Sequence, residues 1–257
     1  MKDPGPPPLR CPACAAPLPH PAACPACGAR FDPIAGFPHL IAPGSVVGTD
    51  RMMRWIYHRL GRLHDPAVKH LLSRLDGFDE TSLREGILDL LNPPPTGRLL
   101  DVGCGTGQEL MRLGHRCPQA ELVGVDLTPG MLSIGRENLR RAEISAWLAL
   151  ADVHALPFPD AQFDAVVHVG GFNNFRDRPR ALAELLRVTR PGGAVVVVDE
   201  RLDPTRRHGP LSLLTYAALT WYDPDRRGPE AHLPTGARYE LRQLSRFYFG
   251  LRLEKPA

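Results

Sequence analysis

The sequence predicts an α/β protein whose main domain is a parallel β-sheet covered by helices. From residue 96 onward, apolar runs of strand length alternate with stretches of helical periodicity, which is the pattern of a parallel sheet with helical crossovers. The first of these runs opens into a glycine-rich turn followed by a helix. Aspartates stand at the ends of three runs, at positions 101, 126 and 152. Together these observations predict a ligand site at the carboxyl ends of the strands.

The composition bounds the rest of the molecule. The 257 residues suffice for one such domain and a small appendage. There is no run of 18 apolar residues and no N-terminal signal sequence, so we expect a cytoplasmic protein without a membrane span. The net charge is only +3 and nearly all basic residues are arginine. Because a compositional bias explains the arginine content, the charge does not lead us to expect a nucleic-acid partner.

Four cysteines near the N-terminus form two Cys-x-x-Cys pairs. The pairs, separated by nine residues, are Cys11 with Cys14 and Cys24 with Cys27. Two such knuckles supply the four thiolates of a tetrahedral Zn²⁺ site. A disulfide pair would suit a secreted chain, and a redox pair would begin the helix of a βαβ unit, which these cysteines do not. The pattern predicts a structural zinc ribbon over residues 11–40, with no open position for catalysis.

Two further segments flank the ribbon. Residues 1–10 are rich in proline and are expected to form a disordered tail. Apolar residues at helical spacing predict a helical cap over residues 49–95. Its three expected helices are Arg51–Leu60, Pro66–Leu75 and Thr81–Leu91, the last ended by Asn92 and three prolines. Trp55 and Tyr57 fit either a substrate pocket or core packing.

The elements of the main domain, residues 96–257, follow from the same periodicities. Strands are expected at Arg98–Val102, Glu121–Asp126, Trp147–Leu150, Phe163–Val169 and Ala194–Val198. Helices are expected at Thr106–His115, from Pro129 to Ala142, at Pro179–Thr189 and, as an insertion, at Leu211–Trp221. An antiparallel hairpin at Tyr239–Leu244 and Phe247–Leu253 would close the sheet, which gives seven strands in all.

The glycine-rich turn narrows the class of ligand. The stretch Asp101-Val102-Gly103-Cys104-Gly105-Thr106-Gly107 has glycine at alternate positions, and Gln108 stands where a dinucleotide fingerprint needs glycine. No Lys-Ser or Lys-Thr pair follows, so the turn is not a phosphate loop. The stretch resembles the first motif of class I S-adenosylmethionine-dependent methyltransferases. The resemblance implies their Rossmann-like seven-stranded sheet, with the zinc ribbon and the helical cap as additions.

S-adenosylmethionine is therefore the expected cofactor, beside structural Zn²⁺. The resemblance implies that the turn contacts the methionine portion and that Asp101 lies near its ammonium group. It also implies that Asp126 binds the ribose hydroxyls, Leu127 packs on adenine and Asp152 binds the adenine amino edge. Asp126 also lies about twenty residues beyond the turn, where a ribose-binding acid is expected. The full expected set is Asp101, Gly103, Gly105, Thr106, Asp126, Leu127, Asp152, Val153, His168 and Val169.

Further motifs resemble the branch that contains the ubiquinone and menaquinone C-methyltransferases. They are Leu156-Pro157-Phe158-Pro159-Asp160, Gly171-Phe172-Asn173-Asn174-Phe175 and Arg187-Val188-Thr189-Arg190-Pro191-Gly192-Gly193. This branch favours a small-molecule acceptor, with aromatic and isoprenoid molecules as the expected classes. The cysteine knuckles resemble instead the N-terminal zinc module of 23S rRNA guanine-N1 methyltransferases, where the module helps bind RNA.

Little side-chain chemistry is needed, because the sulfonium is an activated methyl donor. A general base is needed only for an acceptor that must lose a proton. His154 is the catalytic candidate that we select, with His168, Tyr57 and His58 as alternatives. No Asn-Pro-Pro-Tyr-type motif follows the fourth strand, which argues against amino-adenine or glutamine N-methylation.

Three functions are compared on these grounds. The leading one is an S-adenosylmethionine-dependent methyltransferase that acts on a small molecule and carries a structural zinc ribbon. The alternative is a 23S rRNA guanine N-methyltransferase that uses the zinc ribbon for RNA binding. Residues 9–31 offer only Arg10 and Arg30 as fixed cations for that role. The second alternative is a non-catalytic zinc-ribbon adaptor, which the intact glycine turn and the three acids disfavour.

Overall fold

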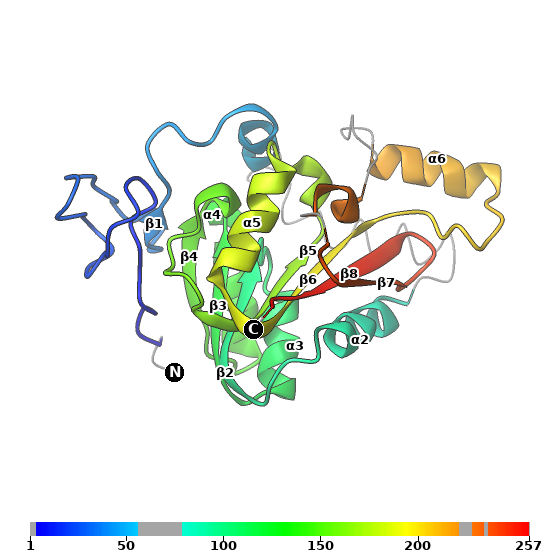
Figure 1. Cartoon of the computed structure of the whole chain (residues 1–257), viewed down its shortest axis with the longest axis horizontal. Helices are drawn as coiled ribbons and strands as arrows, with labels where there is room; N and C mark the ends of the chain where they lie inside the picture. The colour runs from blue at the N-terminus through cyan, green and yellow to red at the C-terminus, as the bar shows by residue number, and fades with distance from the viewer. Residues whose placement is uncertain (1–3, 56–78, 221–227, 234–235, 257) are drawn as a thin grey trace.

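An eight-stranded sheet forms the centre of the molecule (Figure 1). The computed structural model describes residues 4–55, 79–220, 228–233 and 236–256. The strand order is β1-β4-β3-β2-β5-β6-β8-β7, in which β8 runs antiparallel to β6 and β7 and all other neighbours are parallel. The strands are β1 (His39–Leu40), β2 (Thr96–Val102), β3 (Gln119–Asp126), β4 (Trp147–Ala151), β5 (Phe163–Val169), β6 (Thr189–Glu200), β7 (Tyr239–Gln243) and β8 (Tyr248–Glu254).

Helices cover both faces of this sheet. They are α2 (Glu80–Leu91), α3 (Gln108–Arg116), α4 (Pro129–Arg141), α5 (Arg178–Val188) and α6 (Pro210–Leu219), with short 3₁₀ helices η1 (Val153–Ala155), η2 (Phe172–Asn174) and η3 (Pro229–His232). Residues 48–55 are also helical. The leucines of α2, α3 and α4 pack on one face and those of α5 on the other, while α6 lies outside these layers (Figure 1). No helix in the described ranges has the length and apolar character needed to cross a membrane.

The seven predicted strands are present, and β7 and β8 form the predicted closing hairpin. The eighth strand, β1, was not predicted. His39 of β1 pairs with Leu150 of β4, and the Leu150 N–H donates to the carbonyl oxygen of Pro38 at 2.8 Å. Two residues are too few to show a period-two pattern, so this edge strand is visible only in three dimensions.

β6 begins earlier than predicted. Pro191-Gly192-Gly193 suggested a break between a helix ending at Thr189 and a strand starting at Ala194. In the structure α5 ends at Val188 and β6 begins at once, with a shift of register opposite Phe163 to Ala165. Gly192 has a left-handed φ of 74°, so the glycines allow an irregular strand to continue where other residues would end it.

α2, which the sequence analysis placed in the cap, packs against the sheet. Its N-cap Asp79 accepts a backbone N–H of the first turn, and Asn92 ends it with a left-handed φ of 46°. Ile87 and its neighbouring leucines are buried in the same apolar cluster as residues of β6 and β8. α2 is therefore part of the helical layer of the core. The expectations for Tyr57, His58 and the helix Pro66–Leu75 lie outside the described residues.

The cysteine module, residues 9–31, packs on the face of the sheet that α5 covers. Its buried apolar residues share one cluster with residues of β4 and the following loop, and the set includes Leu9, Leu18, Phe31, Trp147 and Phe158. The Arg10 N–H also donates to the carbonyl oxygen of Pro157 at 2.9 Å. The expectation of a disordered tail over residues 1–10 is therefore wrong at its end, because burial and this hydrogen bond hold Leu9 and Arg10 in place.

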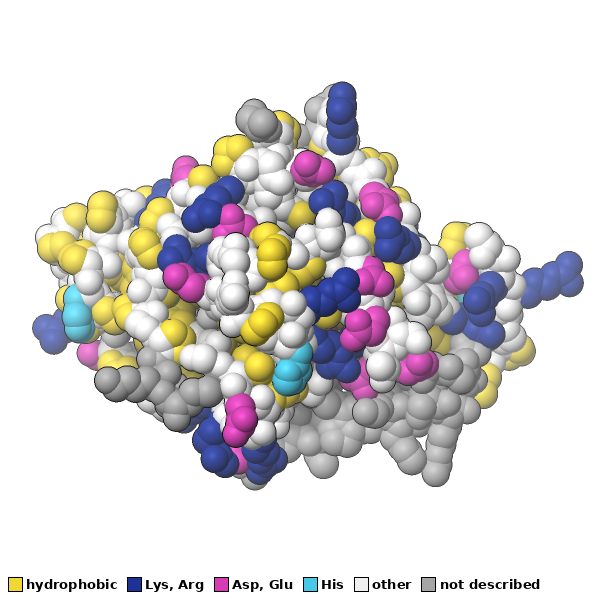
Figure 2. Space-filling model, turned by 90° about the horizontal axis from the view of Figure 1, so that it is seen from below, with side chains coloured by type: hydrophobic (Ala, Val, Ile, Leu, Met, Phe, Trp, Pro, Cys, Tyr) yellow, Lys and Arg dark blue, Asp and Glu magenta, His cyan; other side chains and the backbone are white. Residues whose placement is uncertain are grey.

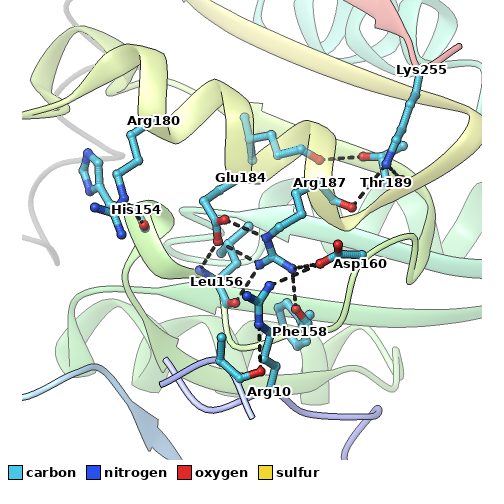
Figure 3. Close-up of polar contacts among 12 residues, drawn as sticks. Arg10, His154, Leu156, Phe158, Asp160, Arg180, Glu184, Arg187, Thr189 and Lys255 are labelled. Carbon is cyan, nitrogen blue, oxygen red and sulfur yellow. Dashed lines mark hydrogen bonds and ion pairs between the residues drawn. The ribbon is translucent and has the colours of Figure 1, made fainter. Parts of the chain in front are cut away.

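The Asp160 carboxylate joins the module to the main domain, because Arg10 of the module and Arg187 of α5 both pair with it (Figure 3). Arg187 also holds the loop that contains Asp160. Its guanidinium donates to the carbonyl oxygens of Leu156 at 3.0 Å and Phe158 at 2.8 Å, and it pairs with Asp160 at 2.8 Å. Arg10 of the module pairs with the same Asp160 carboxylate at 3.2 Å. Arg187 thus holds the loop that follows β4, and this loop begins with three of the predicted site residues, Asp152, Val153 and His154.

Candidate functional site

The glycine turn is anchored to the neighbouring strand by its own backbone. The N–H groups of Gly103 and Cys104 both donate to the carbonyl oxygen of Val125, at 2.7 and 3.0 Å. Gly103, Gly105 and Gly107 all have left-handed φ angles, of 73°, 50° and 79°, which only glycine adopts without strain. The glycines at alternate positions are therefore explained by the left-handed φ angle that the backbone has at each of the three positions.

α4 packs directly against this turn. A Cβ atom on Gly135 would lie only 2.9 Å from the carbonyl oxygen of Gly105, so a side chain there would push the helix and the turn apart. Asn138 of the same helix donates to the carbonyl oxygen of Thr106 at 3.0 Å. The turn is thus held from two sides, by β3 and by α4.

A pocket opens where β2, β3 and β4 end. Its empty volume is about 360 Å³, which includes the open solvent at its mouth. Its lining residues are Asp50, Val102, Gly103, Val125, Asp126, Leu127, Ala151, Asp152, Val153, His154 and Phe175. The structure therefore brings together six of the predicted residues: Gly103, Asp126, Leu127, Asp152, Val153 and His154.

Asp126 links the pocket to the turn. Its Oδ2 accepts the Gly105 N–H at 2.9 Å and its Oδ1 accepts the Thr128 N–H at 2.7 Å. Burial raises the pKa of Asp126, and these two donors oppose the shift. Since each carboxylate oxygen can accept more than one hydrogen bond, the group retains acceptor capacity toward the pocket that it lines.

Asp101 lies behind the pocket wall at the end of β2. It is buried, and its Oδ2 has no hydrogen-bond partner among the described residues. Burial, with the nearby carboxylates of Glu109 and Asp126, raises the pKa of Asp101 well above its usual range. An unsatisfied buried acceptor is costly, and a cationic donor beside the turn would relieve both the missing bond and the unfavourable charge.

Asp152 and His154 belong to a buried network. His154 Nδ1 lies 2.7 Å from Asp152 Oδ1, and its Nε2 accepts the Asp177 N–H at 3.3 Å. The second oxygen of Asp152 accepts from Arg176 at 2.8 Å, and Arg176 also pairs with Asp50. As a candidate base, His154 therefore has both ring nitrogens engaged by this chain.

His168 lies beside the pocket at the end of β5. Its Nδ1 donates to the carbonyl oxygen of Val102 at 2.7 Å, which leaves Nε2 as the acceptor nitrogen. That Nε2 is buried and has no partner in the part of the chain that the structure describes. Burial lowers the pKa of His168, so its ring is neutral near pH 7. Its ring packs on Phe175, with 4.7 Å between the ring centroids.

Five predicted residues do not line the pocket: Asp101, Gly105, Thr106, His168 and Val169. Gly105 and Thr106 continue the turn beyond it, and Asp101 and His168 are buried next to it. Five lining residues were not predicted as site residues: Asp50, Val102, Val125, Ala151 and Phe175. Arg176, which pairs with Asp50, was not predicted either. Asp50 comes from the helical residues 48–55 and shows no local pattern, whereas Phe175 belongs to a motif that the sequence analysis noted without giving it a role.

The four N-terminal cysteines form a second candidate centre. Their sulfur atoms all lie within 4.8 Å of one another, with 3.8 Å from Cys11 to Cys27 and 3.6 Å from Cys14 to Cys24. A tetrahedral Zn²⁺ site with bonds of about 2.3 Å requires sulfur atoms about 3.8 Å apart. The backbone N–H of Cys27 helps to lower the pKa of the Cys24 thiol to about 7, which favours the thiolate that a metal binds.

The two knuckles repeat one backbone pattern. The Ala15 N–H donates to the carbonyl oxygen of Cys11, and the Gly28 N–H donates to that of Cys24, both at 2.9 Å. Ala15 and Gly28 have left-handed φ angles of 66° and 72°. Alanine therefore takes a position in the first knuckle that glycine takes in the second, at some cost in backbone strain.

Comparisons with known proteins agree with this geometry. A family model described as "Methyltransferase domain" matches residues 100–197. The demethylmenaquinone methyltransferase of Thermus thermophilus is 42% identical over 130 residues, which are 50% of this chain and 59% of that protein. The demethylmenaquinone methyltransferase of Thermotoga maritima is 30% identical over 167 residues, 65% of this chain and 69% of that protein. The chain spans about half the length of several curated relatives that it matches.

A solved structure shows the same fold. The geranyl diphosphate C-methyltransferase of Streptomyces coelicolor A3(2), in complex with Mg²⁺, geranyl diphosphate and S-adenosylhomocysteine, superposes with a TM-score of 0.55 at 16% sequence identity. The superposition covers 68% of this chain and 79% of that chain. At this identity the likeness concerns the fold.

Proposed function

Because this chain belongs to the class I methyltransferase family that includes the demethylmenaquinone methyltransferases, we propose that it transfers a methyl group from S-adenosylmethionine to a small molecule. The observation that carries the proposal is the pocket at the ends of β2, β3 and β4, where the glycine turn and Asp126 meet. Ligands of open parallel sheets bind at this edge.

The chain's residues fit S-adenosylmethionine along the length of the pocket. Gly103 offers a wall without a side chain to the methionine portion. Asp101, buried behind that wall with no partner for its Oδ2 among the described residues, would accept from the ammonium group. Asp126 would accept the ribose hydroxyls, as its place on the pocket wall supports. Leu127 and Val153 would pack on the adenine ring, with Asp152 accepting from its amino group.

The bound cofactor supplies an activated methyl group on a sulfonium. The protein then has to orient an acceptor in line with that methyl and exclude water. His168 is buried beside the pocket, and its Nε2 has no partner within the described ranges, which supports this residue as the base where the acceptor must lose a proton. The engaged ring of His154 supports a structural role. The hydrogen bond from Nδ1 of His168 to the Val102 carbonyl oxygen fixes the orientation of the ring and therefore of the Nε2 lone pair.

We further propose an aromatic or isoprenoid acceptor. The names of the relatives support this class, because demethylmenaquinone methyltransferases match the chain over 123–167 residues at 30–43% identity. The fold likeness to geranyl diphosphate C-methyltransferase is compatible with it. The four-cysteine cluster would hold Zn²⁺ as a structural ion, as the sulfur separations support.

The structure offers little for an RNA-binding ribbon. Arg10, one of the two cations of the ribbon, is paired with Asp160 and donates to the Ala15 carbonyl oxygen. On the face shown in Figure 2, basic side chains are interspersed with acidic ones. A nucleic-acid groove needs several unpaired cations in a row, so these contacts favour the small-molecule acceptor.

Incubation with methyl-labelled S-adenosylmethionine and cell extract tests the proposal. The extract is split into RNA and small-molecule fractions after the reaction. We expect label in the small-molecule fraction, in an organic-extractable product, and none above background in RNA. Label in RNA alone would overturn the acceptor class and favour the rRNA alternative. Boiled protein and extract without protein are the controls.

A further inference from the structure

A buried network of charges joins the N-terminal helical residues to the end of β4. Arg176, which follows η2, donates to Asp152 Oδ2 at 2.8 Å and forms an ion pair with Asp50. His154 Nδ1 lies 2.7 Å from Asp152 Oδ1 and 3.6 Å from Asp50 Oδ2. Asp50 is 7% exposed and Asp152 is 3% exposed. Two carboxylates from distant parts of the chain thus share one guanidinium inside the protein.

We propose that Arg176 is a positioning residue for cofactor binding, which holds Asp152 and Asp50 in place as two parts of the pocket wall. This inference rests on the proposed function, because it assigns the adenine end of S-adenosylmethionine to the part of the pocket that these carboxylates line. Arg176 is not among the lining residues, so it acts through its two partners.

The electrostatics require such a residue. Asp50, Asp152 and His154 have ligand atoms within 4.8 Å of one another, and two buried carboxylates at that distance repel each other strongly. A planar guanidinium can donate to two carboxylates at once, whereas an ammonium is a point charge with no fixed fork. Since the cation that these acids need is already supplied by Arg176, the cluster does not call for a metal ion.

The position of Asp50 gives the network a second consequence. Asp50 lies in the helical residues 48–55, which follow β1 along the chain, and its pair with Arg176 places this helix at the pocket. β1 itself pairs with β4 at Leu150 and Ala151, directly before Asp152. The same pocket wall is therefore built by the end of β4 and by the segment that arrives from the cysteine module.

The test measures binding of S-adenosylmethionine by calorimetry and steady-state kinetics in four variants. Arg176→Met should raise the dissociation constant for S-adenosylmethionine by at least about tenfold, because the buried carboxylate loses a charge-assisted hydrogen bond. KM for S-adenosylmethionine should rise with it while kcat changes by less than about threefold. Arg176→Lys should bind between the parent and Arg176→Met, and Asp50→Asn should also weaken binding.

Arg190→Met is the matched control. Arg190 pairs with Asp164 at 2.6 Å near the start of β5. This is the amino end of the parallel strands, whereas the pocket lies at their carboxyl ends. We expect this variant to bind like the parent. Binding by Arg176→Met within twofold of the parent, or an equal loss in Arg190→Met, would overturn the proposal.

Folding is checked in every variant by its melting temperature. If Arg176→Met does not fold, Asp50→Asn and Arg176→Lys decide, and parent-like binding in both would overturn the proposal. Failure of the parent itself to bind S-adenosylmethionine is a different result, because it contradicts the proposed function.

Discussion

Replacing Asp126 with alanine is expected to weaken S-adenosylmethionine binding by at least about 100-fold. The variant would lack the carboxylate that is proposed to accept from the ribose hydroxyls, and each such hydrogen bond to a charged acceptor is worth about 1.5–3 kcal/mol. The substitution would also release the Gly105 N–H, which the carboxylate accepts at 2.9 Å, so the glycine turn would lose one of its anchors. Isothermal titration calorimetry of the parent and the variant measures the effect.

Glu121→Ala is the control for this experiment. Glu121 lies on the same strand, β3, near its other end, where it is exposed and pairs with Arg98. An exposed pair of this kind contributes little, so the control should bind like the parent. Asp126→Ala binding within about threefold of the parent would contradict the ribose assignment.

The second large effect is expected from the cysteine cluster. Cys11→Ser should reduce bound zinc from about one equivalent per chain to a small fraction, because a closed four-thiolate site tolerates no missing ligand well. It should also lower the melting temperature of the whole chain by about 5–10 °C. The reason is the shared core: Leu9, Leu18 and Phe31 of the module are buried together with Trp147 and Phe158.

Zinc is measured by inductively coupled plasma mass spectrometry and the melting temperature by calorimetry. Cys117→Ala is the control, because Cys117 is buried and free but lies outside the cluster. It should retain the zinc of the parent and lose little stability. A Cys11→Ser protein with full zinc content and an unchanged melting temperature would show that the cluster is not a structural metal site.

The sheet and the turn could be predicted because their signals are local. Ala194–Val198 is an uninterrupted apolar run because a central parallel strand is buried on both sides, and its valines are fully buried. The glycines at 103, 105 and 107 are each required by a left-handed φ angle. Asp126 is the last residue of its strand, at the end where ligands of open parallel sheets bind. In each case the structural requirement determines the type of residue at that same position, so the sequence shows it directly.

The rest depends on contacts between distant segments. Asp50 lines the pocket and pairs with Arg176, which lies 126 positions further along the chain. Neither residue belongs to a sequence pattern that would predict this pair. The sequence favours His154 as the catalytic candidate because it lies just beyond the end of a strand, close to Asp152. In the structure, the Asp177 N–H donates to its second ring nitrogen. β1 and the burial of Leu9 likewise depend on surfaces that other elements create.

Titration of the parent protein with S-adenosylhomocysteine, the demethylated product of the cofactor, tests the central claim most directly. Isothermal titration calorimetry should show one binding site per chain, and S-adenosylmethionine should compete for it, because both molecules share the adenosine and amino-acid groups that the pocket is proposed to hold. Binding should be lost in Asp126→Ala and kept in Glu121→Ala. Absence of binding by the folded parent at millimolar S-adenosylhomocysteine would contradict the claim that the ends of β2, β3 and β4 form a methyltransferase cofactor site.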